Sequence, residues 1–295
     1  MDHGEPESYA LLAGVNTVAA TPASESNRNI LVNLLRGFPR LNQMPEFQRI
    51  KGMDVPVAIV GGGPSLAKHL DELREFRHIM AAGSVHDYLR AHGFTPEYAV
   101  MCDPDPIMAN YLRNPSSETK YLLSSHCDDK VFKALDGMSI ALWHCAPVDE
   151  ELMNKADPGW HSVGGGCTVG LRAISIAIVL GYQNIHLFGM DSSIGDTDDE
   201  HHAYNFTDDS EELGKIYVVK LGLGKNGPIE GSRSYRCAGY QMAQADHFRL
   251  LVQHYGNVFS PTFHGDGLLP AMWKQISEEA QKTGVEPQGE ELNGQ

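Results

Sequence analysis

The sequence predicts an α/β protein with a Rossmann-like, doubly wound and mostly parallel sheet. Short apolar runs that are typical of buried strands alternate with helical patterns between residues 55 and 193. Two glycine-rich turns, at Gly61–Gly63 and Gly164–Gly166, each stand between an expected strand and an expected helix. Because the connections are short and strands alternate with helices, a parallel sheet is the expected architecture.

The expected elements follow from hydrophobic spacing, caps and helix stops. We expect strands at residues 55–60, 79–82, 98–102, 120–124, 139–144, 185–188 and 257–260. We expect helices at residues 29–36, 66–76, 85–92, 130–135, 169–180, 239–254 and 270–280. Ser24 or Ser26 would cap the first helix and Pro39 would stop it, while Thr168 would cap the apolar helix through its hydroxyl and Gly181 would end it.

The chain is expected to form one main domain with tails. Residues 1–52 are assigned to an N-terminal extension, residues 53–262 to the Rossmann-like domain, and residues 263–295 to a C-terminal helix and a flexible polar tail. Within the domain, residues 194–235 are polar, acidic and too long for an ordinary connection, which favours a lid or a substrate loop.

Composition restricts the partners. The formal net charge of -15 disfavours nonspecific binding to nucleic acid or to an anionic membrane surface. The N-terminus has no apolar signal core, no stretch is long enough to span a bilayer, and five cysteines lie far apart without a CxxC pair. These features favour a cytoplasmic protein that acts on small molecules, and they are compatible with a homo-oligomer.

The two glycine turns are the expected ligand-binding elements. A glycine-rich turn before a helix lets backbone approach a ligand, and the free amides of the helix favour a phosphate. The first turn is neither a full Rossmann fingerprint nor a Walker A loop, and a purely structural turn is the alternative. The predicted nucleotide-binding residues are Gly61, Gly62, Gly63, Pro64, Ser65, Gly164, Gly165, Gly166 and Thr168.

Carboxylates and histidines near strand ends are the catalytic candidates. Asp103 begins a DPDP stretch after one strand and Asp191 follows another, so each could position a ligand or hold Mg²⁺, although an Asp-Pro turn without a ligand is the alternative for Asp103. His202 closes an acidic stretch for which a solvated loop is favoured over a metal site. The general base stays open among His126, His144, His202 and Asp103.

Three motifs together resemble the MptE-like family, which includes archaeal 6-hydroxymethyl-7,8-dihydropterin pyrophosphokinases and motility accessory factors linked to flagellin glycosylation. They read VAIVGGGPSL, YAVMCDPDP and GGGCTVGLRAISIAIVLGYQNIHLFGMDSS, within residues 53–193. A more distant similarity is to bacterial CMP-sialic-acid sialyltransferases, and it implies nucleotide contacts at Gly62–Ser65 and Gly165–Thr168. Those sialyltransferases have a catalytic histidine in the loop downstream. This chain departs from their pattern because no histidine stands between His202 and His247.

The leading hypothesis is therefore a nucleotide-dependent transferase that passes a glycosyl group from a nucleotide-activated sugar donor to an unidentified acceptor. In it the glycine turns hold the nucleotide, and Asp103, Asp191 and His202 are catalytic. The alternative is a pyrophosphokinase that uses ATP and Mg²⁺, with the metal on Asp103 and Asp191. A non-catalytic nucleotide-binding or assembly protein is the third reading, because fold does not fix function.

Overall fold

A computed structural model describes residues 23–44, 55–145, 150–195, 202–204, 215–224, 227–256 and 259–283. Its centre is an eight-stranded sheet in the order β10-β7-β1-β2-β3-β4-β5-β6, and its neighbouring strands all pair in parallel. The strands are β1 (Val57–Val60), β2 (His78–Ala82), β3 (Tyr98–Met101), β4 (Lys120–Ser124), β5 (Ser139–Cys145), β6 (Ser162–Val163), β7 (Ile185–Phe188) and β10 (Thr262–His264). The predicted Rossmann-like, doubly wound fold class is confirmed.

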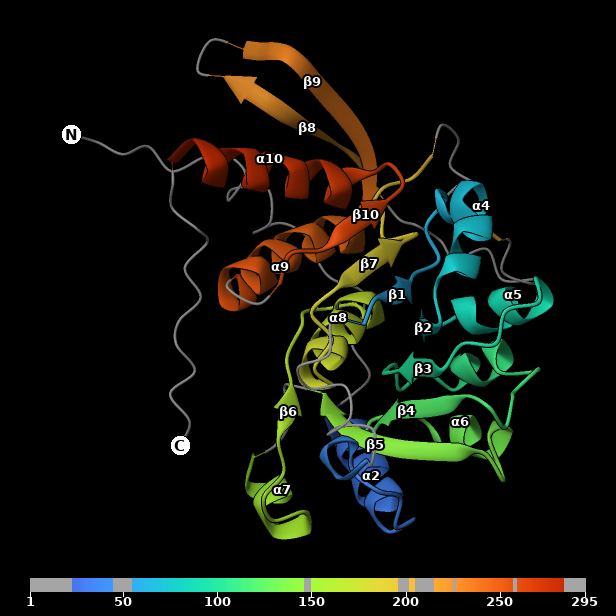
Figure 1. The fold of residues 1–295 in the computed structure, drawn as a ribbon. Helices are drawn as coiled ribbons and strands as arrows, with labels where there is room; N and C mark the ends of the chain where they lie inside the picture. Colours follow the sequence, from blue (N-terminus) through green and yellow to red (C-terminus); the bar gives the residue numbers. More distant parts are fainter. Residues whose placement is uncertain are drawn as a thin grey trace.

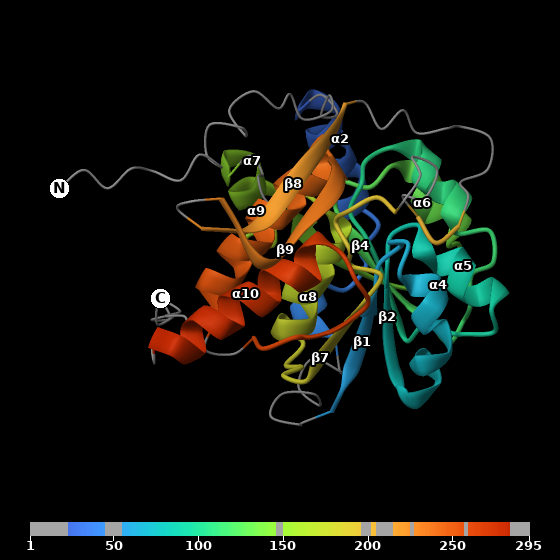
Figure 2. The ribbon, with the colours of Figure 1, turned by 90° about the horizontal axis from the view of Figure 1, so that it is seen from above.

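Helices cover both faces of the sheet (Figures 1 and 2). One face carries α4 (Leu66–His69), η2 (Leu70–Glu75), α5 (Val85–Ala91), η3 (Pro106–Tyr111) and α6 (Asp129–Ala134). The other face carries α8 (Val169–Val179), α9 (Gly239–Tyr255) and α10 (Leu268–Thr283). The remaining described helices are α2 (Ala23–Leu34), η1 (Leu41–Gln43) and α7 (Glu150–Ala156). Within the described residues, no helix is both long and apolar enough to cross a lipid bilayer.

Alternate residues of each strand feed two apolar cores. In β1, Val57 and Ile59 pack toward α8 and α9, while Ala58 and Val60 pack toward α4 and α5. All four residues are fully buried, as expected for a parallel strand that is covered on both faces. Helix α8 is apolar around most of its circumference, and eight of its residues are buried because it lies between the sheet and α9.

The order of the strands reverses between β1 and β7. From β1 the chain adds strands in one direction as far as β6, and α8 then crosses back so that β7 pairs with the free side of β1. In open α/β sheets, ligands bind outside the carboxyl ends of the strands at such a switch point. The turns after Val60 and Phe188 therefore lie where a ligand is expected.

Several sequence predictions are corrected in detail. The helix expected over 66–76 is a short α4 followed by the 3-10 helix η2, although Leu66, Leu70 and Leu73 still face the core. Ser24 and Ser26 lie inside α2, so neither is its cap. The last strand is β10 at Thr262–His264; residues 259–260 are not in a strand, and residues 257–258 lie outside the described residues.

The largest correction concerns residues 194–235, which were predicted to form a loop. Their described part is mainly an antiparallel hairpin of β8 (Ile216–Gly224) and β9 (Gly227–Ala238), which rises beside α10 in Figure 1. Val219, Leu221 and Tyr235 pack against the core, which gives the hairpin a buried side. Residues 196–201, 205–214 and 225–226 lie outside the described residues, and the acidic stretch before His202 falls among them.

The segment before β1 is joined to the sheet by buried polar contacts. The side-chain amide of Asn33 donates to the carbonyl oxygens of Ser125 (2.9 Å) and Cys127 (2.8 Å), and Asn33 is only 1% exposed. Leu41 and Met44 belong to the apolar core. The predicted domain boundaries stay a prediction, but α2 and η1 pack closely on the main domain.

We expect Asn33→Ala to lower the free energy of unfolding by about 2 kcal/mol, because it leaves two buried carbonyl oxygens without their donor. Urea denaturation monitored by circular dichroism measures the loss. Asn29→Ala is the matched control, since Asn29 makes one partly buried bond to the carbonyl oxygen of His126 and should cost less. Equal losses in the two variants would contradict this account of Asn33.

Candidate functional site

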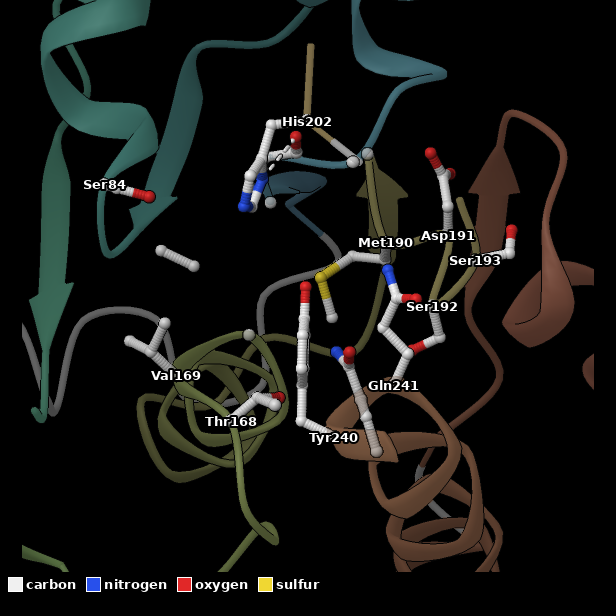
Figure 3. Close-up of a pocket in the computed structure, with 17 residues that line it drawn as sticks. Ser84, Thr168, Val169, Met190, Asp191, Ser192, Ser193, His202, Tyr240 and Gln241 are labelled. Carbon is white, nitrogen blue, oxygen red and sulfur yellow. Dashed lines mark hydrogen bonds between the residues drawn. The ribbon is translucent and has the colours of Figure 1, made fainter. Parts of the chain in front are cut away.

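A cavity of about 130 Å³ opens at the switch point. Its walls come from the turns after β1, β2 and β7, from the first turn of α8, from the start of α9 and from His202. Figure 3 shows these side chains converging on one space from separate elements. The cavity therefore brings together segments that lie more than 180 residues apart in the sequence.

The turns after β1 and β7 touch through their backbones. A Cβ on Gly61 would stand 2.7 Å from the carbonyl oxygen of Gly189, and a Cβ on Gly63 would stand 2.5 Å from Oδ2 of Asp191. Both separations are shorter than side-chain carbons tolerate. Gly61 and Gly63 are therefore required for the two turns to pack, whether or not a ligand is present.

Most donors of the Gly61–Ser65 turn already have protein partners. The amides of Gly61 and Gly63 donate to the carbonyl oxygens of Phe188 and Gly189, both at 2.8 Å. The amide and the hydroxyl of Ser65 donate to Asp191 at 2.7 and 2.6 Å, and Pro64 has no amide hydrogen. Gly61, Gly62 and Gly63 line the cavity, whereas Pro64 and Ser65 do not. This turn is mainly a structural wall of the site.

The first turn of α8 offers donors of a different kind. The amide of Arg172 donates to the carbonyl oxygen of Thr168, so the amides of residues 169–171 are the ones that the helix cannot satisfy itself. Thr168, Val169 and Gly170 line the cavity. The positive end of the helix dipole therefore points into the site, which favours an anion there.

Thr168 is at the predicted N-cap position but does not make the predicted bond. Its backbone is extended, with φ -122° and ψ 153°, yet its hydroxyl accepts no hydrogen bond from the helix. The Oγ1 atom is buried and has no partner among the described residues. The expected capping role is corrected: this hydroxyl is a polar group at the cavity wall that none of the described residues bonds.

The glycine run before α8 does not line the cavity. Gly166 packs against His247 of α9, and Gly165 packs against the carbonyl oxygen of Leu171. Gly164, like the other two, is absent from the residues that line the cavity within the described part of the chain. Of the four residues predicted around this turn, only Thr168 faces the ligand space. Arg172 is buried and donates to the carbonyl oxygen of Val163.

Ser192, like Thr168, has a buried hydroxyl at the wall of the cavity. It is 5% exposed, it lines the cavity, and its Oγ has no hydrogen-bond partner among the described residues. Among the described residues it is also the one non-glycine residue with a positive φ, 50°, a conformation that is uncommon outside glycine. Buried polar atoms without partners are rare in folded proteins, so both hydroxyls indicate a ligand or water partner.

Asp191 is buried at the floor of the site. Its carboxylate is 3% exposed and accepts both bonds from Ser65. Burial raises the pKa of Asp191 to about 6, although the bonds from Ser65 act in the opposite direction. The carboxylate is therefore close to its titration range at neutral pH, and its first role is to join the turns after β1 and β7.

His202 lies across the first glycine turn. The amide of Ala203 donates to the carbonyl oxygen of Gly62 at 2.9 Å, and Nδ1 of His202 bonds the same oxygen at 3.1 Å. A carbonyl oxygen only accepts, so Nδ1 carries the proton and Nε2 is the accepting atom of the neutral ring. The hydroxyl of Tyr204 bonds Oγ of Ser84 at 2.8 Å, which fixes the other end of this short segment.

The other predicted catalytic residues lie elsewhere. Asp103 is exposed, and its Oδ1 accepts from the amide of Asp105 at 2.9 Å, which makes the DPDP stretch a local turn. His126 and His144 are buried beside β4 and β5, where burial lowers the pKa of both rings, that of His126 to about 4. Within the described residues, only Asp191 and His202 of these candidates line the cavity.

A metal site does not form from the predicted pair. Asp103 is not among the residues around the cavity, and both oxygens of Asp191 are bonded to Ser65. Over the described part of the chain, no group of three histidine, cysteine, aspartate or glutamate residues could hold a metal ion. The acidic residues 196–200 and His201 fall outside those described.

Sequence reasoning missed the contribution of α9. Tyr240, Gln241 and Gln244 line the cavity from the beginning of this helix. The signal was weak because α9 is separated from the glycine turns by the hairpin, and glutamines in a helix read as surface residues.

A cavity at the switch point of a parallel sheet, with a helix N-terminus in its wall, defines a ligand-binding protein of the doubly wound α/β class. The family model described as 6-hydroxymethylpterin diphosphokinase MptE-like matches residues 28–197, more than half of the chain. The chain therefore belongs to the MptE-like family, and this membership supports a transferase-like function. The match begins within α2, earlier than the motifs that suggested the family. A search of curated proteins found no match.

Comparison with solved structures agrees on the fold. A MAf glycosyltransferase from Magnetospirillum magneticum AMB-1 is 16% identical with a TM-score of 0.60, and the match covers 92% of this chain and 44% of that one. This chain thus spans less than half of that neighbour's length. A mammalian sialyltransferase in complex with Gal-beta-1-3GalNAc-ortho-nitrophenol is 10% identical, with coverage of 86% and 89% and a TM-score of 0.38, too low to carry an argument.

We expect Asp191→Asn to gain stability relative to the wild type as pH rises from 4 to 7. The folded-state pKa of about 6 lies above the ordinary value of 3.8, so ionisation costs more in the folded state. The difference in unfolding free energy between the two proteins should change by up to about 3 kcal/mol in favour of the variant. Urea denaturation at pH 4, 5.5 and 7 measures it, and a difference that is independent of pH would refute the assignment.

Proposed function

We propose that this protein is a nucleotide-dependent transferase that takes a glycosyl group from a nucleotide-activated sugar. The observation that carries the proposal is the first turn of α8, which opens on a switch-point cavity. In this cavity the hydroxyls of Thr168 and Ser192 have no hydrogen-bond partner among the residues that the structure describes. Helix amides and buried hydroxyls at strand ends are suited to binding a phosphate.

The charges around the cavity favour a donor with few negative charges. Among the described residues that line it there is no lysine or arginine, and Asp191 forms part of the wall. A triphosphate would need neutralising cations, whereas a single phosphodiester can be held by helix amides and hydroxyls. The leading candidate is therefore a donor in which one phosphate links the nucleoside to the sugar.

The reaction assigned to the site is a simple displacement. The acceptor hydroxyl oxygen forms a bond with the anomeric carbon, the bond from that carbon to the phosphate oxygen breaks, and the leaving phosphate keeps the electron pair. The amides of α8 would stabilise the charge on that phosphate. Nε2 of His202 is the atom of this ring that can accept the hydroxyl proton.

The description of the family favours a second candidate, diphosphoryl transfer to a hydroxymethylpterin-like substrate. This reaction would use ATP with Mg²⁺. Because Asp103 does not line the cavity with Asp191, the described residues supply no carboxylate pair for the metal. A non-catalytic protein that binds nucleotide without turnover is the remaining alternative.

A thermal-shift screen with CMP, UDP, GDP and ATP, each with and without Mg²⁺, distinguishes the candidates. A ligand that binds only the folded protein raises its melting temperature. We expect CMP to stabilise the protein without metal and more strongly than UDP, and Thr168→Val to reduce the shift. A shift by ATP that requires Mg²⁺ would favour the diphosphokinase, and no shift by any nucleotide at saturating concentration would refute both enzymatic candidates.

A further inference from the structure

The beginning of α9 faces the first turn of α8 across the cavity. Gln241 and Gln244 are three residues apart, so they lie on the same side of the helix. Both line the cavity, and Figure 3 shows Tyr240 and Gln241 rising from α9 toward the space beside Met190 and Thr168. None of the glycine turns provides these side chains.

The orientation of the Gln241 carboxamide is fixed by its own helix. Its Oε1 accepts from the amide of Ala238 at 2.9 Å, and the residue is 4% exposed. Because an amide N–H needs an acceptor, the oxygen must point to Ala238 and the NH₂ group must be the free end of the carboxamide. Gln241 therefore presents a hydrogen-bond donor at the cavity wall.

Gln244 places its amide nitrogen beside the α8 N-terminus. Its Nε2 stands 3.7 Å from the position that a Cβ would take on Gly170. Gly170 is the second residue of α8, whose amide lacks an intrahelical acceptor. A side-chain donor and main-chain donors thus lie on two sides of the same small volume, which also adjoins the Thr168 hydroxyl.

We propose that Gln241 and Gln244 bind the anionic group of the ligand and, together with the first turn of α8, form a receptor made only of neutral donors. This inference rests on the proposed function and adds the side chains that bind the phosphate. An anion is favoured over the edge of a nucleobase because the donors gather at a helix N-terminus, where negative charge is stabilised.

Because this receptor contains no positive charge, one negative charge added to it would repel the anionic group of the ligand. Gln244→Glu preserves the size of the side chain but replaces the donor by a carboxylate. Gln241→Glu preserves the oxygen that accepts from Ala238 and removes only the NH₂ group, so the N-terminus of α9 keeps its cap. Gln244→Leu removes the donor without adding charge.

Titration calorimetry with CMP and cytidine, and with UDP and uridine, tests the inference on the full chain. We expect Gln244→Leu to weaken nucleotide binding about tenfold to hundredfold, as loss of a hydrogen bond to a charged group does, and both Glu variants to weaken it more. Binding of the uncharged nucleosides should change less than twofold. The wild-type preference for nucleotide over nucleoside should therefore shrink in each variant.

Gln253 provides the matched control, because it is an exposed residue of the same helix and does not line the cavity. Gln253→Leu and Gln253→Glu should bind like the wild type, and circular dichroism should show all variants folded. If the wild type binds nucleotide and the Gln241 and Gln244 variants bind equally well, this inference fails while the proposed function stands. Equal weakening of nucleoside and nucleotide would also overturn it. If the wild type binds no nucleotide, the proposed function itself fails.

Discussion

The close approach of backbone around Asp191 is the constraint on which the site depends. Gly63 approaches it from the turn after β1, and Gly265 and Gly267 approach it from the segment after β10. A Cβ on Gly267 would stand 2.5 Å from the carbonyl oxygen of Asp191. Because glycine stands at each contact, two loops can cover one carboxylate. The same crowding explains why Asp191 is dehydrated and why its pKa is raised.

This packing determines which side of the cavity is left for a ligand. The turn after β1 resembles a phosphate loop, but the amides of Gly61, Gly63 and Ser65 and the Ser65 hydroxyl are already bonded to Phe188, Gly189 and Asp191. A donor that is already bonded must lose that bond before it can bind a phosphate, which makes it a poor ligand group. Among the described residues, the donors left for a ligand lie mainly opposite, in the first turn of α8, at Ser192 and at the beginning of α9. The ligand is therefore expected to contact the two helices more than the first glycine turn.

The sequence was sufficient for most of the sheet and insufficient for the details of the site. Strand β6 was not predicted, and β10 was predicted too early in the chain. Buried parallel strands are short apolar runs, so β4 and β7 were predicted at the residues where they occur. The hairpin was missed because its acidic surroundings hid the alternation of Tyr217, Val219 and Leu221, although Asn226-Gly227 is a strong hairpin signal. The direction of a hydroxyl or a carboxamide, as in Thr168 and Gln241, depends on tertiary contacts and cannot be read from local spacing.

Because the described lining of the cavity contains no lysine or arginine, the proposed anionic ligand would be attracted only at short range. The net charge of -15 repels anionic ligands at a distance, but at physiological salt this field is screened beyond about 8 Å. Helix amides and carboxamides act within hydrogen-bond distance, where a buried site is screened much less. Recognition then depends on geometry rather than on total charge, because neutral donors bind one well-placed phosphate but do not neutralise the charge of additional ones. The negative charge of the whole chain and the neutral donors of the cavity therefore both favour a ligand with a single phosphate.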